Sequence, residues 1–208
     1  MIVIITEMKQ LEKYAEEKNI PIMDKNGLKF LINYIRDNNI KSILEIGSAI
    51  GYSAINMALA DEKVLVTTIE KNESRYLEAL KNIKKFNLDK RIILILGDAL
   101  DLKIEEKYDL IFIDAAKGQY INYFDKYKDN LKDRGTIISD NIYFRGLVEQ
   151  KDKIEKKSLQ QLIDKIKRYI LYLKNHKEFK TVFYKIGDGL SISKRRKWLY
   201  VQNISCAN

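Results

Sequence analysis

The chain has 208 residues, of which 46% are hydrophobic and one is proline; this suits one compact domain and excludes a disordered or fibrous protein. A single cysteine, Cys206, excludes an intramolecular disulfide framework, and no apolar run approaches the length of a membrane span. The net charge is +9. The first residues lack the pattern of a secretory signal, so we expect a cytoplasmic enzyme without membrane contact.

Apolar periodicity predicts alternating helices and strands. Helical spacing covers residues 11–19, 27–38 and 73–86, and four residues of the last segment are predicted to share its buried side: Tyr76, Leu77, Leu80 and Ile83. Short apolar runs that end in glycine or a polar residue predict strands in SILEIG (42–47), VLVTTIE (64–70), RIILILG (91–97), YDLIFID (108–114) and GTIISDN (135–141). Continuously apolar strands separated by helices are typical of a parallel sheet covered on both faces, so we predict a doubly wound α/β domain.

The last third of the chain contains a long amphipathic segment and a hairpin. Residues 151–180 predict a helix and its approach, with five apolar residues turned inward: Leu159, Leu162, Ile163, Ile166 and Ile170. TVFYKI (181–186) and LSIS (190–193) flank Gly187-Asp188-Gly189, which predicts an antiparallel hairpin. We predict one domain over residues 1–196 and a flexible tail over 197–208.

A glycine loop follows the first predicted strand, in LEIGSAIGYS. Gly47 and Gly51 permit a sharp turn and a close approach to a ligand, although many α/β proteins use such glycines only for packing. Glu70 ends the second strand, where an acidic side chain can bind both hydroxyls of a ribose. Asp98 and Ala99 end the third strand, where an adenine edge could be bound. These residues together predict a nucleoside site.

The loop favours S-adenosylmethionine (SAM) over a dinucleotide. It lacks the G-x-G-x-x-G spacing of NAD-binding proteins. Glu45 precedes Gly47 by two residues, and its carboxylate suits the sulfonium and amino groups of SAM but would repel a pyrophosphate.

Oxygen ligands follow the fourth and fifth strands. Asp114 ends one strand, and Asp140 with Asn141 ends the other, so we expect these groups to converge beside the SAM site. Such ligands suit Mg²⁺ or another hard divalent cation with positions left for substrate oxygens. Asp140-Asn141 could instead only cap a turn, and Lys117, which is predicted to lie over the substrate, could be an ordinary surface lysine.

The combined motifs resemble those of the metal-dependent O-methyltransferases of the catechol and caffeoyl-CoA type. The resemblance runs from about residue 21 to 194 and rests on LEIGSAIGYSAINMA, IEKN, GDA, FIDAAKGQY, SDN and IGDGLSISK. Within that group, LEKYAEEKNIPIM, IGSAIGYSAI, FIDAAKGQY and DNIYFRGLV resemble the bacterial tRNA 5-hydroxyuridine methyltransferases more closely. The resemblance implies a Rossmann-like fold with a mostly parallel seven-stranded sheet, a C-terminal antiparallel hairpin and helices on both faces. Residues 1–40 would form helices that cover the SAM site.

The resemblance also implies roles for individual residues. Positions that match SAM contacts are Met23, Glu45, Gly47, Tyr52, Ser53, Glu70, Asp98, Ala99 and Asp114. Those that match metal ligands are Asp114, Asp140 and Asn141, and Lys117 and Asp114 are the implied catalytic residues. Relatives of this type are often dimers, so we expect a homodimer.

The predicted acceptor is 5-hydroxyuridine at the wobble position of tRNA. Its 5-hydroxyl lies beside the 4-carbonyl, so both oxygens can chelate one metal as a catechol does. A wobble base in the single-stranded anticodon loop can enter a pocket while basic residues hold the phosphates.

The distribution of charge bears on this choice. Residues 145–208 contain 16 Lys and Arg against 6 Asp and Glu, whereas the first 144 contain 22 and 23. The excess is either a solvated lysine-rich helix or a surface for RNA, with Arg145, Lys194, Arg195 and Arg196 as candidate contacts. A small-molecule catechol-type enzyme would not need this excess. A non-catalytic RNA-binding module would have no reason for the three metal-ligand positions.

Overall fold

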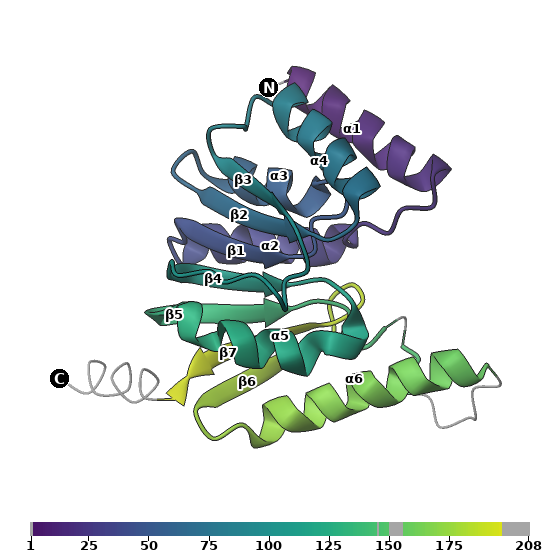
Figure 1. Cartoon of the computed structure of the whole chain (residues 1–208), viewed down its shortest axis with the longest axis vertical. Coiled ribbons are helices and arrows are strands. Elements are labelled where there is room, and N and C mark those ends of the chain that lie inside the picture. Colours follow the sequence, from purple (N-terminus) through teal and green to yellow (C-terminus); the bar gives the residue numbers. More distant parts are fainter. Residues whose placement is uncertain (1, 145, 150–155, 197–208) are drawn as a thin grey trace. The chain divides into compact units, whose positions relative to one another are not determined.

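The computed structural model of the chain describes residues 2–144, 146–149 and 156–196 (Figure 1). The chain divides into two compact units, Met1–Lys103 and Ile104–Asn208. The predicted tail over 197–208 lies outside the described residues. The prediction of a single domain over residues 1–196 stays a prediction.

The first unit combines parallel strands with helices. Its elements in chain order are α1 (Ile2–Glu17), α2 (Lys25–Asp37), β1 (Ser42–Ile46), α3 (Tyr52–Ala60), β2 (Leu65–Glu70), α4 (Glu73–Lys85) and β3 (Ile92–Leu96). The strands are parallel and lie in the order β3-β2-β1. Since Gly47 and Glu70 follow or end neighbouring parallel strands, the strand register brings them to the same edge of the sheet.

Side-chain caps fix where two helices of this unit begin. Asp24 accepts hydrogen bonds from the backbone N–H groups of Asn26 and Gly27 at the start of α2, at 2.9 and 3.2 Å. Asn72 accepts one from Arg75 at the start of α4, at 3.0 Å. Both helices agree with the predicted segments. α1 begins well before residue 11, where the predicted helix starts. The sequence did not indicate this earlier start, because the four consecutive apolar residues at the beginning of α1 show no helical period.

Two expectations about burial in this unit are wrong. Leu77 is 49% exposed, because the buried side of α4 is formed by Ala79, Asn82 and Ile83 one step around the helix. β3 is not covered on both faces, since Ile93 is 64% exposed. β3 is the end strand in the order, which leaves its side chains with fewer neighbours.

The second unit contains the remaining strands and the C-terminal hairpin. Its elements are β4 (Tyr108–Ile113), the 3-10 turn η1 (Lys117–Gln119), α5 (Tyr120–Tyr127), the 3-10 turn η2 (Lys128–Asn130), β5 (Leu131–Ser139), α6 (Lys157–Asn175), β6 (Phe179–Tyr184) and β7 (Leu190–Arg195). The order is β4-β5-β7-β6; β4 and β5 are parallel, and β7 is antiparallel to both β5 and β6. The predicted α/β fold with a mostly parallel sheet and a C-terminal antiparallel hairpin is confirmed.

Helices α5 and α6 lie side by side (Figure 1). They contact each other through aromatic side chains. Phe124 forms edge-to-face contacts with Tyr169 and Phe179, and all three rings are buried. Ile163 and Ile166 of α6 are fully buried, with Leu159, Leu162 and Ile170 packed against the same cluster, as predicted. α6 is shorter than the predicted segment, because β6 begins at Phe179.

Candidate active site

The glycine loop after β1 is held in a tight turn by its backbone. Gly47 and Gly51 have φ angles of 99° and 83°, which favour glycine, and Ala49 also has a positive φ of 47°. The N–H groups of Gly47 and Ser48 donate to the carbonyl of Ile69 at 3.0 and 3.2 Å. The Ser48 hydroxyl is buried and finds no hydrogen-bond partner among the described residues. A buried hydroxyl of this kind fits a loop that binds a polar ligand.

Glu70 organises the same loop. Its two carboxylate oxygens accept the backbone N–H groups of Ala49 and Asn72, each at 2.8 Å, and the residue is only 6% exposed. A carboxylate has about four acceptor positions, so these two bonds leave capacity for the hydroxyls of a ribose. These two bonds therefore fix the orientation of the Glu70 carboxylate, the predicted ribose contact, before any ligand binds.

The other predicted SAM residues of the first unit are distributed around this loop. Glu45 is fully buried, and its carboxylate accepts a hydrogen bond from the Thr68 hydroxyl. Ser53 is buried in the first turn of α3, and Met23 is buried just before α2. Asp98 accepts the N–H of Leu100 at 2.9 Å. Ala99, beside Asp98, is also buried.

Tyr52 has a role that the sequence did not predict. Its hydroxyl donates to Glu12 of α1 at 2.9 Å, and burial raises the pKa of Tyr52 well above its ordinary value. Lys25 donates to the same carboxylate at 2.8 Å. Glu12 thus ties α1 to the start of α3 and to α2, within the region predicted to cover the SAM site.

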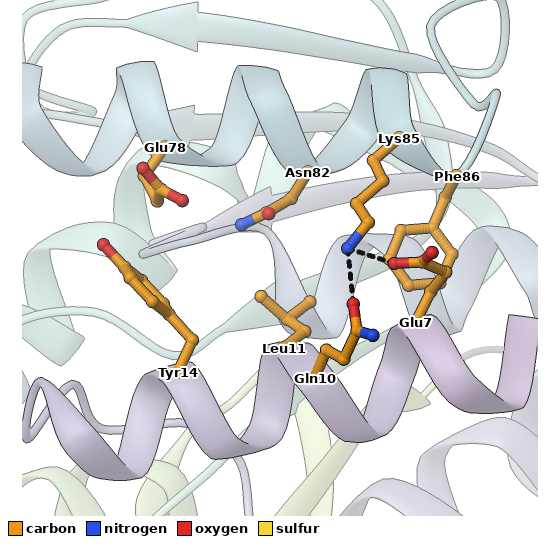
Figure 2. A pocket seen from close by; sticks show the side chains of 8 residues that line it. All are labelled: Glu7, Gln10, Leu11, Tyr14, Glu78, Asn82, Lys85 and Phe86. Carbon is orange, nitrogen blue, oxygen red and sulfur yellow. Dashed lines mark hydrogen bonds and ion pairs between the residues drawn. The ribbon is translucent and has the colours of Figure 1, made fainter.

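Helix α1 also forms a groove with α4, shown in Figure 2. Lys85 donates to Gln10 at 2.9 Å and forms an ion pair with Glu7. The groove is lined by Glu7, Gln10, Leu11, Tyr14, Glu78, Asn82, Lys85 and Phe86. These lining residues, all in the described part of the chain, include none that was predicted to bind SAM. α1 packs against α4 at this groove.

The second unit brings the predicted metal ligands together with the predicted catalytic lysine. Asp114 follows β4, and Asp140 follows β5, which pairs with β4 in parallel. Burial raises the pKa of Asp140 well above its ordinary value, and the charge of Asp114 raises it further. Burial likewise raises the pKa of Asp114, and the charge of Lys117 lowers both pKa values. The two carboxylates and the ammonium group therefore lie within one electrostatic site.

Asp140 has an unsatisfied oxygen that fits a cation. Its Oδ1 accepts the N–H of Asn141 at 2.7 Å, whereas its buried Oδ2 finds no hydrogen-bond partner within the described residues. Asn141 has a φ of 57°, a left-handed conformation that asparagine tolerates better than most residues. The described residues include no cluster of three or more His, Cys, Asp or Glu side chains suited to hold a metal. The predicted metal ligands are not a cluster of that kind, because they comprise two carboxylates and one asparagine amide.

Three residues near these groups were not singled out from the sequence. The Tyr120 hydroxyl donates to the backbone carbonyl of Asp140 at 3.1 Å, and Tyr120 is 1% exposed. Lys117 lies over the Phe144 ring, 5.6 Å from its centroid. The charge of Asp188 raises the pKa of both Asp114 and Asp140. The GDG motif signals a turn, and no sequence pattern connects that turn with the end of β5.

The candidate RNA-contacting residues differ in their exposure and in their hydrogen bonds. Arg145 lies outside the described residues. Arg195 donates to Glu178 at 3.2 Å and to the carbonyl of Lys128 at 2.8 Å, and its guanidinium lies over the Phe179 ring. Arg196 is exposed, and its guanidinium donates to the carbonyl of His176 at 3.3 Å. Lys194 is half-buried.

Taken with the fold, the glycine loop, the acidic end of β2 and the oxygen-rich end of β5 define a Rossmann-like methyltransferase. The chain belongs to the O-methyltransferase family, whose model matches residues 4–196. The predicted enzyme class, a SAM-dependent O-methyltransferase, is thereby confirmed. In addition, no described helix has the length and apolar character that crossing a membrane requires.

Known proteins resemble the chain over most of its length. A caffeoyl-CoA O-methyltransferase of Medicago sativa is 31% identical over 91% of this chain and 82% of its own. The crystal structure of a candidate caffeoyl-CoA O-methyltransferase from Staphylococcus aureus is 36% identical, with a TM-score of 0.86 over 90% of this chain and 91% of its own. An O-methyltransferase from Bacillus cereus, solved in complex with S-adenosylhomocysteine, is 26% identical, with a TM-score of 0.78 over 92% and 91% of the two chains.

Proposed function

We propose that the chain transfers a methyl group from SAM to the 5-hydroxyl of 5-hydroxyuridine at the tRNA wobble position, with Mg²⁺ or another divalent cation bound to the acceptor. The observation that supports this best is the pair of buried carboxylates beside Lys117: burial raises the pKa of both Asp114 and Asp140, and the charge of Asp114 raises that of Asp140 further. Two buried carboxylates that repel each other favour the binding of a cation.

The donor site is proposed for the first unit. Glu70 is held by two backbone N–H groups and has acceptor capacity left for the ribose hydroxyls. The buried Ser48 hydroxyl supplies a further polar contact within the glycine loop. The relative from Bacillus cereus binds S-adenosylhomocysteine, which is SAM without its transferred methyl group.

The acceptor chemistry is proposed for the second unit. Asp114, Asp140 and Asn141 would hold the cation, which would lower the pKa of a hydroxyl bound to it. The unsatisfied Oδ2 of Asp140 supports this assignment. Lys117 would stabilise the resulting oxyanion as an ammonium group, or accept the hydroxyl proton as a neutral amine. Displacement at a sulfonium needs little beyond alignment and a deprotonated nucleophile.

Exposed cations on α6 support a polyanionic acceptor. Lys157, Lys165, Arg168 and Lys174 are exposed on this helix. Lys165 lies next to the predicted catalytic turn, since a Cβ built on Gly118 would be 3.2 Å from its Nζ. The guanidinium of Arg195, a candidate RNA contact, already donates hydrogen bonds to Glu178 and to the carbonyl of Lys128. We therefore propose Lys165, and not Arg195, as the phosphate contact nearest to Lys117.

The relatives favour a second candidate. Those from Medicago sativa and Staphylococcus aureus are named for caffeoyl-CoA, a small-molecule acceptor whose adjacent oxygens could bind the same cation. A catechol or caffeoyl-CoA O-methyltransferase is therefore the alternative function. We also propose that the chain is a homodimer, which sedimentation of the purified protein would test.

The test compares acceptors and a charge reversal. Wild-type protein is assayed with tRNA that contains 5-hydroxyuridine, with caffeoyl-CoA and with a simple catechol. We expect turnover on tRNA, and Lys165→Glu should reduce it several-fold. The control Lys90→Glu makes the same charge change at an exposed position of the first unit and should leave the rate unchanged. Turnover on caffeoyl-CoA or catechol without turnover on tRNA would establish the alternative.

A further inference from the structure

The hairpin turn between β6 and β7 holds the chain segment that follows the metal ligands. Tyr143 and Phe144 both donate their backbone N–H groups to the carbonyl of Asp188, at 2.9 and 3.2 Å. Ile142 donates to the carbonyl of Gly189 at 3.1 Å. Three successive N–H groups immediately after Asn141 therefore bond to two residues of one turn.

The approach between the turn and this segment is close. A Cβ built on Gly189, which has a φ of 91°, would lie 2.2 Å from Cδ2 of Tyr143. Lys185, just before the turn, lies over the Tyr143 ring at 5.5 Å and forms an ion pair with Glu149 at 2.6 Å. Since only glycine permits this contact without a shift of Tyr143, the turn packs directly against the ligand segment.

The side chain of Asp188 adds a third carboxylate to the electrostatic site. Its charge acts on Asp114 and on Asp140, as the raised pKa values of both show. If a bound cation keeps all three carboxylates ionised beside Lys117, their net charge is −2, which one divalent cation would neutralise.

We propose that Asp188 is a positioning residue of the metal centre: its carbonyl fixes the segment that carries Asp140 and Asn141, and its carboxylate completes the negative charge that a divalent cation neutralises. It acts through the ligands, in the way that hydrogen-bonded outer groups orient and tune metal sites. The inference rests on the proposed function, since it requires a metal at these ligands.

The test measures metal affinity directly, without turnover. Mn²⁺ binding to the full-length protein is measured by calorimetry for wild type, Asp188→Asn and Asp188→Glu. Asp188→Asn keeps the backbone carbonyl and removes only the charge, so we expect Mn²⁺ affinity to fall about 10- to 100-fold. Asp188→Glu restores the charge and should recover part of the loss. Asp164→Asn, an exposed carboxylate of α6 bonded to Gln160, is the charge-matched control and should bind as wild type does.

The outcomes separate this inference from the proposed function. A loss in Asp188→Asn that Asp164→Asn does not share, with Asp188→Glu binding more tightly than Asp188→Asn, supports the positioning role. Equal affinity in wild type and Asp188→Asn, with binding lost in Asp140→Ala, would overturn the role of Asp188 and leave the metal site intact. Failure of the wild type to bind Mn²⁺ would overturn both.

Discussion

Replacing Glu70 with alanine tests the donor site and the loop that builds it. The substitution removes the acceptor from the N–H groups of Ala49 and Asn72, which bond to it at 2.8 Å each. If each bond to this charged group contributes about 1.5 kcal/mol, the loss amounts to about 3 kcal/mol of unfolding free energy. For a chain of this size that lowers Tm by about 6–12 °C.

The assay has two readouts. Thermal unfolding of wild type and Glu70→Ala measures the contribution to the loop, and calorimetric titration with SAM, well below both Tm values, measures the ribose contact. We expect SAM affinity to fall about 10- to 100-fold, because hydrogen bonds to a charged acceptor are lost. Glu62→Ala is the control, since Glu62 is an exposed glutamate of the same unit.

Two results would refute parts of this reasoning. A lowered Tm with unchanged SAM affinity would make Glu70 a residue that only organises the loop, and the ribose assignment would be wrong. An unchanged Tm would show that water replaces the carboxylate at both N–H groups without cost.

Other changes act on the second unit. Asp140→Ala should abolish turnover while calorimetry still detects SAM binding, because the metal would position the acceptor; full activity in excess EDTA would contradict the metal mechanism. Gly189→Ala should destabilise the protein by about 2 kcal/mol or more in denaturant unfolding, since its Cβ would clash with Tyr143. Burial lowers the pKa of His176, whose Nδ1 accepts two backbone N–H groups. The stability it contributes is therefore present above the ordinary histidine pKa and lost as pH falls through the lowered value; denaturant midpoints that fall equally with pH in wild type and His176→Ala would refute this.

Much of the fold follows from local patterns. The strand runs that end at Gly47, Glu70 and Asp114 all form strands, because short, continuously apolar runs separated by helices are typical of a covered parallel sheet. The errors occur where burial depends on distant neighbours. Leu77 fits the helical period of α4 but faces solvent, and Ile93 is apolar but lies on the end strand.

The site was predictable to the extent that strand ends carry it. Asp114 and Asp140 follow parallel neighbouring strands, so their proximity follows from topology. Asp188 and Tyr120 could not be predicted in this way, since their contacts cross from a hairpin turn and a helix. The same limit applies to Arg195, which a charge count marks as a free cation although Glu178 and Phe179 engage it.

The choice of acceptor requires an argument beyond the ligand set. A catechol, a caffeoyl-CoA ester and 5-hydroxyuridine all present adjacent oxygens, so Asp114, Asp140 and Asn141 cannot distinguish them. Phosphate contacts distinguish tRNA from an uncharged catechol. With tRNA, the logarithm of affinity should fall by about 0.7–0.9 per logarithmic unit of salt for each contact. An uncharged catechol should show almost no slope.

A CoA ester also carries phosphates, so a salt slope alone does not identify tRNA. The decisive result is a slope that Lys165→Glu reduces with tRNA and leaves unchanged with caffeoyl-CoA. Equal slopes for Lys165→Glu and wild type on tRNA would show that α6 is a solvated surface at Lys165 and would favour the small-molecule acceptor.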